Sequence, residues 1–175
     1  NHVSYFDPYI IGIINYHHNK DYWNLRVVAY HKVLELPIAG YVLRSIGALA
    51  IKMQNTKVTE NNKYDKESVR ILMEKCKKLI NDGYSLFMFP EGKRNIDPSR
   101  INEIRGGAFN LSTDTGRPIQ ILVLKGVHNI WSATGYPDGY GTIKVTKYDD
   151  PVKFSTVEEY REQVTNIMSQ YVSDR

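Results

Sequence analysis

The sequence has a single cysteine, Cys76, among its 175 residues. One cysteine cannot close a disulfide within the chain or build a cluster of thiolate metal ligands, so neither device holds this fold together. No stretch approaches the roughly 20 apolar residues that a membrane-spanning helix needs. Lysine and arginine are nowhere dense enough to indicate a nucleic-acid-binding tail. We therefore expect a domain that depends on its own hydrophobic core, with no nucleic acid as a partner.

The chain also lacks an initiator methionine and a signal peptide, because it opens on Asn1. We interpret it as a fragment of a longer protein, in which an anchor could precede residue 1. Its 175 residues are enough to bury a core as one domain covering 1–175. The formal charge of +4 and the pI near 9.0 are compatible with an anionic substrate or a membrane surface.

Hydrophobic periodicity and turn residues predict helices that alternate with strands. The expected helices cover 7–18, 33–44, 65–82, 106–115 and a last helix from Ser155, and the expected strands cover 25–30, 48–53, 85–89, 119–127 and 141–147. Pro37 should interrupt the second helix, Gly83 should end the third, and Ser155 should form a capping box with Glu158. Cys76 falls on the apolar face of the third helix. This order predicts a single α/β domain with a largely parallel or mixed central sheet flanked by helices.

The first eight residues contain a histidine and an aspartate at a suggestive spacing. Asp7 precedes Pro8, and this pair is typical of a helix N-terminus. A loop that enters the helix could fold His2 back onto the Asp7 carboxylate. A histidine held by a carboxylate is a general base with a fixed tautomer. The alternative is that Asp7 only caps the helix and His2 is an ordinary loop residue.

The second informative stretch is Phe89-Pro90-Glu91-Gly92-Lys93-Arg94, which follows a predicted strand. Gly92 permits a tight turn, and the planar fork of an arginine suits a phosphate or a carboxylate. Glu91 cannot bind an anion itself, but it could orient Arg94 or accept a hydrogen bond from a substrate hydroxyl. The alternative is a solvated turn with an internal Glu–Arg pair, which would contribute little energy.

Together, Asn1-His2-x-x-x-x-Asp7 and Phe-Pro-Glu-Gly-x-Arg resemble the glycerolipid acyltransferase family, most of all its 1-acylglycerol-3-phosphate acyltransferases. The segments between and after these motifs agree with the resemblance, at Lys32, Glu35, Pro37 and Gly40 and at Arg105-Gly106-Gly107-Ala108 with Pro118-Ile119. Other positions depart from it. Met53 stands where the family usually has an arginine, with Lys52 beside it, and Lys93 and Asn95 replace a threonine and a serine.

The resemblance implies transfer of a fatty acyl chain from acyl-CoA or acyl-carrier protein to a glycerolipid hydroxyl, giving phosphatidic acid. His2 would be the general base and Asp7 would hold its imidazole. Glu91, Gly92, Lys93, Arg94 and Lys52 would bind the acceptor, and neither a metal nor another cofactor is expected. The implied partners are a glycerolipid phosphate, acyl-CoA and a membrane surface, at the endoplasmic reticulum or another intracellular membrane. The alternatives are a sibling enzyme that acylates glycerol-3-phosphate or a lysophospholipid or exchanges acyl chains, and a catalytically silent lipid-binding domain.

Overall fold

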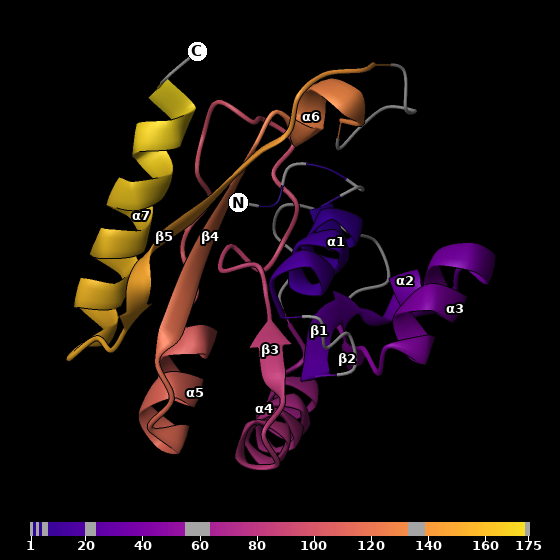
Figure 1. Ribbon diagram of the computed structural model, residues 1–175. Helices are drawn as coiled ribbons and strands as arrows, with labels where there is room; N and C mark the ends of the chain where they lie inside the picture. Colours follow the sequence, from indigo (N-terminus) through magenta and orange to yellow (C-terminus); the bar gives the residue numbers. More distant parts are fainter. Residues whose placement is uncertain are drawn as a thin grey trace. The chain divides into compact units, whose positions relative to one another are not determined.

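The computed structural model describes residues 2, 4, 7–19, 24–54, 64–132 and 139–173 of the chain (Figure 1). The chain divides into two compact units, one formed by Asn1–Ile14 with Phe89–Arg175 and the other by Asn15–Met88. The helix α1 (Asp7–Asn19) begins in the first of these units and ends in the second. The expectation of one domain over residues 1–175 stays a prediction.

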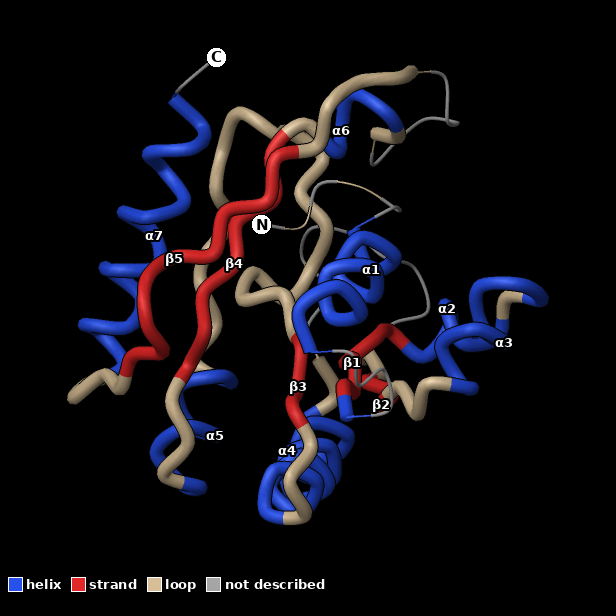
Figure 2. Tube along the Cα trace, viewed as in Figure 1, coloured by secondary structure: helices blue, strands red, loops and turns tan. Residues whose placement is uncertain are grey.

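The unit formed by Asn15–Met88 contains a parallel sheet of three strands, drawn in red in Figure 2. The central strand is β1 (Leu25–Tyr30), and it pairs with β2 (Leu49–Ile51) on one side and β3 (Ser85–Phe87) on the other. The parallel sheet is confirmed. The two outer strands are shorter than predicted, because β2 ends before Met53 and β3 ends before the Phe-Pro-Glu-Gly turn.

The segment after β1 forms two helices where the sequence predicted one. These are α2 (His31–Glu35) and α3 (Pro37–Ser45), and Leu36 between them is extended, with φ of −65° and ψ of 138°. The residue before a proline is pushed out of the helical region by the proline ring, so α2 has to end there. Pro37 then suits the first position of α3, where no N–H is needed. Pro37 therefore begins a helix rather than interrupting one.

The long helix α4 (Lys66–Asn81) confirms the third predicted helix. Its N-cap is Asp65, whose side chain accepts a hydrogen bond from the Ser68 N–H, and Gly83 follows its end with a φ of +93°. Leu72 and Cys76 are buried on its inner face. Burial raises the pKa of the Cys76 thiol to about 11, which is the behaviour of a core residue.

The unit that contains both termini has an antiparallel pair, β4 (Ile119–Lys125) and β5 (Lys144–Val152). The predicted strand over 119–127 is therefore two residues too long, and the one over 141–147 begins three residues too early. Gly126 explains the first error, because its φ of +86° takes the chain out of the strand and into the short helix α6 (Val127–Ile130). A Cβ at Gly126 would lie 2.5 Å from the Thr142 carbonyl oxygen, so no larger residue fits.

The helices α5 (Gly107–Thr115) and α7 (Val157–Ser173) complete this unit, and Figure 1 shows α7 running along β4 and β5. The predicted cap of α7 is wrong by one residue. Thr156 accepts the N–H of Glu159, and the Glu159 carboxylate accepts the N–H of Ser155. The capping box thus starts at Thr156, because both of its hydrogen bonds use Glu159 rather than Glu158.

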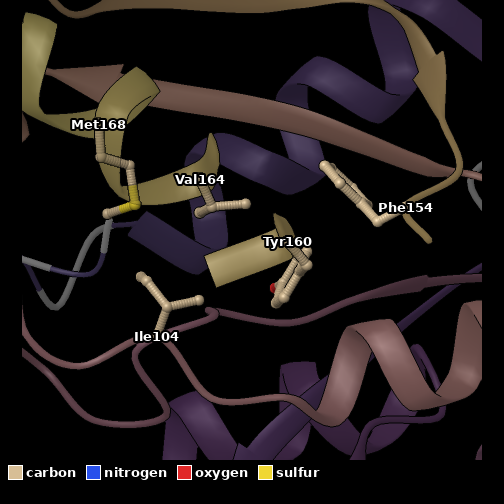
Figure 3. Close-up of a cluster of buried hydrophobic side chains, with 5 residues drawn as sticks. All are labelled: Ile104, Phe154, Tyr160, Val164 and Met168. Carbon is tan, nitrogen blue, oxygen red and sulfur yellow. The ribbon is translucent and has the colours of Figure 1, made fainter. Parts of the chain in front are cut away.

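The main hydrophobic cluster of this unit lies on the inner face of α7 (Figure 3). Tyr160, Val164 and Met168 project from the helix at the spacing that the sequence predicted, and they pack with Ile104 and Phe154. Partly buried residues of α5 and β4 pack against the same cluster. Burial raises the pKa of the Tyr160 hydroxyl to about 12. The cluster joins α7 to Ile104, which lies at the end of the loop that follows the Phe-Pro-Glu-Gly turn.

Among the residues that the structure describes, no helix combines the length and the apolar character needed to cross a bilayer.

Candidate functional site

His2 and Asp7 form a hydrogen-bonded pair at the N-terminus of α1. The Nδ1 atom of His2 lies 2.9 Å from Oδ2 of Asp7. The Asp7 side chain is fully buried, whereas the His2 side chain keeps 18% of its surface exposed. A carboxylate can only accept, so Nδ1 carries the proton and Nε2 is the basic nitrogen of the neutral ring. The loop before α1 thus folds His2 back onto Asp7, as the sequence predicted.

The same carboxylate oxygen fixes the loop itself. Oδ2 of Asp7 accepts the backbone N–H of Ser4 at 2.8 Å, and the Ser4 hydroxyl donates to the carbonyl of Trp131. Ser4 is completely buried. Asp7 is therefore more than the first residue of a helix, because its carboxylate binds both the His2 ring and the Ser4 backbone.

The Phe-Pro-Glu-Gly turn holds the backbone of His2 from both sides. Oε1 of Glu91 accepts the His2 N–H at 3.0 Å, and the Asn95 N–H donates to the His2 carbonyl at 2.6 Å. Glu91 is 1% exposed, and its second oxygen accepts the N–H of Asn102 at 3.1 Å. The alternative of a solvated turn is thereby wrong for Glu91. Its contacts favour a role in positioning His2 over direct contact with a substrate.

An aromatic contact fixes the plane of the imidazole. The His2 ring stacks on the Phe89 ring with centroids 3.9 Å apart and an angle of 8° between the planes. Burial lowers the pKa of His2 below 6.5, the Asp7 carboxylate opposes this shift, and the charge of Arg94 adds to it. The ring is therefore neutral near pH 7, which is the state a general base requires.

Gly92 makes the turn possible, with a φ of +69° and a hydrogen bond from its N–H to the Phe89 carbonyl. Lys93 and Arg94 follow it, and both are half-buried. Arg94 directly precedes Asn95, whose N–H binds the His2 carbonyl, and the positive charge of Arg94 lowers the pKa of His2. The turn thus carries one buried carboxyl group, that of Glu91, and two basic side chains within four residues.

Lys52 differs from the other predicted site residues, since it belongs to the unit formed by Asn15–Met88. Its side chain is exposed, and its backbone is hydrogen-bonded to Asp65 and to the Ser68 hydroxyl near the start of α4. Met53 beside it is half-buried and forms a bridge with Tyr64. A role for Lys52 in binding the acceptor stays a prediction.

No group of three or more histidine, cysteine or acidic side chains that could hold a metal ion occurs in the described part of the chain. The arrangement around His2 can perform proton transfer: a neutral imidazole has a carboxylate behind it and a cation nearby.

Sequence reasoning assigned no role to Ser4, Phe89 or Asn95. Asn95 was noted only as a replacement for serine, although Asn-x-Asp-Pro at 95–98 is a typical turn sequence that could have marked it. Nothing local marks Ser4, because its partner Trp131 lies 127 residues away.

Both the fold and the sequence of this chain are similar to those of known proteins. In the crystal structure of the 1-acyl-sn-glycerophosphate (LPA) acyltransferase PlsC from Thermotoga maritima, the same fold recurs with a TM-score of 0.73. The alignment covers 99% of this chain and 63% of that one at 18% sequence identity, so the likeness concerns the fold.

A sequence model of the family described as Acyltransferase matches residues 1–125. The chain therefore belongs to the acyltransferase family. Two curated relatives are 25% identical over 130 residues, which is 74% of this chain: the 1-acyl-sn-glycerol-3-phosphate acyltransferases BAT2, chloroplastic, of Brassica napus and LPAT1, chloroplastic, of Arabidopsis thaliana. The matched segment is 33% and 32% of those two proteins, so this chain corresponds to about a third of their length.

Proposed function

We propose that this chain transfers a fatty acyl group from a thioester donor to the free hydroxyl of 1-acylglycerol-3-phosphate, giving phosphatidic acid. The observation that carries this proposal is the His2–Asp7 pair, with Nε2 as the basic nitrogen of a neutral, mostly buried imidazole. Family membership supports acyl transfer as the reaction class. The names of the two plant relatives and of the Thermotoga enzyme favour this acceptor over its siblings.

In the proposed reaction, Nε2 of His2 removes the proton from the acceptor hydroxyl as its oxygen attacks the thioester carbonyl. This attack forms the new C–O bond and gives a tetrahedral intermediate. When the intermediate collapses, the C–S bond breaks and the imidazolium returns its proton to the leaving thiolate. Asp7 stabilises the imidazolium between these steps. General-base catalysis of this kind supplies roughly a hundred- to ten-thousandfold in rate.

The acceptor phosphate would bind at Arg94, with help from Lys93 and the Gly92 backbone. An arginine can donate two parallel hydrogen bonds to a phosphate. Because Arg94 adjoins Asn95, which binds the His2 carbonyl, a phosphate held by Arg94 would bring the acceptor hydroxyl near the base. Arg94→Lys keeps the charge but loses the planar fork, so it should raise the KM for the acceptor. This increase should be larger than any change that Arg94→Gln causes in the KM for the donor.

The proposal is tested by offering the full-length protein labelled oleoyl-CoA or oleoyl-acyl-carrier protein with three acceptors in parallel: 1-acylglycerol-3-phosphate, glycerol-3-phosphate and lysophosphatidylcholine. A separate reaction with lysophosphatidylcholine and labelled phosphatidylcholine, without a thioester, tests acyl exchange. Transfer to the first alone supports the proposal, and transfer only to another acceptor replaces it with a sibling activity. If folded protein transfers to none of them, lipid binding without catalysis takes the place of the proposed reaction. If His2→Ala keeps full activity, the protein is a transferase but the His2–Asp7 mechanism is wrong.

A membrane surface, at the endoplasmic reticulum or another intracellular membrane, is part of the proposal. It is supported by an apolar face of α3, where Ile38, Tyr41 and Val42 are 81%, 69% and 38% exposed and Leu36 at its N-cap is 50% exposed. Tyrosine beside aliphatic residues suits the interface between lipid and water. Arg44 on the same helix and the net charge of +4 favour anionic lipid.

Sedimentation with vesicles of phosphatidylcholine and phosphatidylserine, the second of which supplies the anionic surface that attracts basic proteins, tests this surface. Ile38→Glu with Tyr41→Glu should abolish binding, while Ile71→Glu should leave it unchanged. Ile71 is a suitable control because it is an aliphatic residue on α4 that is 43% exposed. Equal binding by the two variants would show that α3 is not the contact.

A further inference from the structure

Asn95 occupies the centre of the hydrogen bonds that hold His2, although it lies 93 residues away in the sequence. It is 6% exposed, and its backbone N–H donates to the His2 carbonyl at 2.6 Å. That hydrogen bond needs only the backbone. The question is therefore what holds the Asn95 backbone in place.

The side chain of Asn95 supplies the answer, because it uses both of its polar atoms inside the protein. Nδ2 donates to the Arg100 carbonyl at 2.6 Å and makes a longer contact of 3.5 Å with Oε2 of Glu91. Oδ1 accepts the N–H of Asp97 at 3.2 Å. The amide thus connects the turn that contains Glu91 to the loop over 97–102.

Glu91 completes the connection, because its two oxygens accept from His2 and from Asn102. One oxygen therefore contacts the catalytic segment while the other contacts the loop that Asn95 also holds. Moving the Asn95 side chain would disturb both of the hydrogen bonds that hold the His2 backbone. A serine at this position would have one hydroxyl on a shorter side chain and could not make all three side-chain contacts.

We propose that Asn95 is a positioning residue of this enzyme, which fixes the backbone of His2 and thereby the orientation of the general base. This inference rests on the proposed function, and it adds a residue to which neither motif assigns a role. Asn95 acts through Glu91 and the His2 backbone, and it does not contact the reacting atoms. A displacement of about 1 Å in a catalytic group can reduce a rate by about a hundredfold.

Asn95→Asp is the most informative change, since it keeps the shape and reverses the hydrogen bonding. The new carboxylate would face Oε2 of Glu91 and the Arg100 carbonyl, both of which are acceptors. Asn110→Asp is the matched control, because it adds the same charge at a residue that is exposed on α5. We expect kcat to fall by about ten- to a hundredfold in Asn95→Asp, with both KM values within about threefold, and no change in Asn110→Asp.

The titration of His2 gives a second readout that does not require activity. The ionisable side chains that contact His2 or shift its pKa are Asp7 on α1 and Glu91 and Arg94 on the turn. If Asn95 holds the ring in its buried position, loosening it hydrates the ring and raises the pKa of His2 toward 6.5. Asn95→Ser adds no charge, so an increase in that variant reports hydration alone. NMR of the imidazole measures it in the full-length protein.

The outcomes separate the two proposals. If the wild type transfers no acyl group but the His2 pKa rises in Asn95→Ser, the positioning role holds and the proposed reaction fails. If the wild type is active and a folded Asn95→Asp protein keeps the wild-type kcat and the wild-type decrease of kcat/KM at acid pH, the positioning role is overturned. Should Asn95→Asp not fold, an Asn95→Ser protein with wild-type kcat and an unchanged His2 pKa overturns it equally.

Discussion

Replacing Asp7 with asparagine separates the two readings of this residue, as helix cap and as partner of a general base. Asparagine starts a helix about as well as aspartate, so the change spares α1. It removes the charge that faces His2 at 2.9 Å. In the reaction the ring becomes an imidazolium, and two opposite charges whose centres lie about 4 Å apart attract by about 4 kcal/mol at an effective dielectric constant of 20. At 1.36 kcal/mol per decade, kcat should fall by about a thousandfold.

The assay is single-turnover acyl transfer from labelled oleoyl-CoA to 1-acylglycerol-3-phosphate, which reports the chemical step without product release. KM for both substrates should change little, because Asp7 is fully buried and acts on the transition state. Asp114→Asn on the exposed side of α5 removes the same charge at the surface and should keep full activity. In the Asp7→Asn/His2→Ala double variant, the rate of acyl transfer should be no lower than in His2→Ala alone.

A folded Asp7→Asn protein that kept more than about a third of the wild-type kcat would refute this reasoning, since the charge would then contribute less than about 1 kcal/mol. Asp7 would then serve only to cap the helix. Circular dichroism and thermal unfolding decide whether a low rate reflects lost structure, because a loss of α1 would appear in both.

Three further predictions follow from buried groups. Burial lowers the pKa of His2 below 6.5, so kcat/KM should be level at pH 7 and should fall only at acid pH. The free energy of unfolding should also decrease as the pH falls below 6.5, because the unfolded state then binds the extra proton. A decrease in either quantity centred above pH 7 would contradict this reasoning. With the pKa of Cys76 at about 11, only about 0.1% of the thiol is ionised at pH 8, so iodoacetamide should modify it in urea but not in buffer. Tyr160→Ala should destabilise the protein by about 3–5 kcal/mol in urea titrations, and Tyr160→Phe by less than about 1.5, because the ring fills the cluster in Figure 3.

The parts of the fold that local rules govern could be predicted from the sequence. The apolar spacing predicted α4 and the buried face of α7, and Gly83 follows the end of α4 with a positive φ, as expected. The errors at Pro37 and Gly126 have different causes. At Pro37 two local rules compete, because a proline can break a helix or begin one. At Gly126 the cause is not local, because the bend brings the chain against the carbonyl of Thr142.

The candidate site divides in the same way. His2 and Asp7 lie five residues apart, so their contact follows from one loop closing onto one helix end. Glu91 was identified by its motif, but its burial could not be, because the three groups that surround its carboxylate come from residues 2, 95 and 102. No local pattern marks Ser4, because its partner Trp131 lies 127 residues away. Asn95 differs, because its side-chain partners lie within five residues and the turn sequence at 95–98 could have marked it.

The two motifs depend on each other, and this explains why they occur together. A histidine near the start of a loop has little to hold it, since fixing one residue costs about 1–2 kcal/mol of backbone entropy. The turn opposes this cost with two hydrogen bonds to the His2 backbone and one stacked ring, all from residues 89–95. Glu91 points inward to do this, which leaves Lys93 and Arg94 as the cations of the same turn. One short segment thus orients the base from behind and brings positive charge to it, and neither motif would form the site alone.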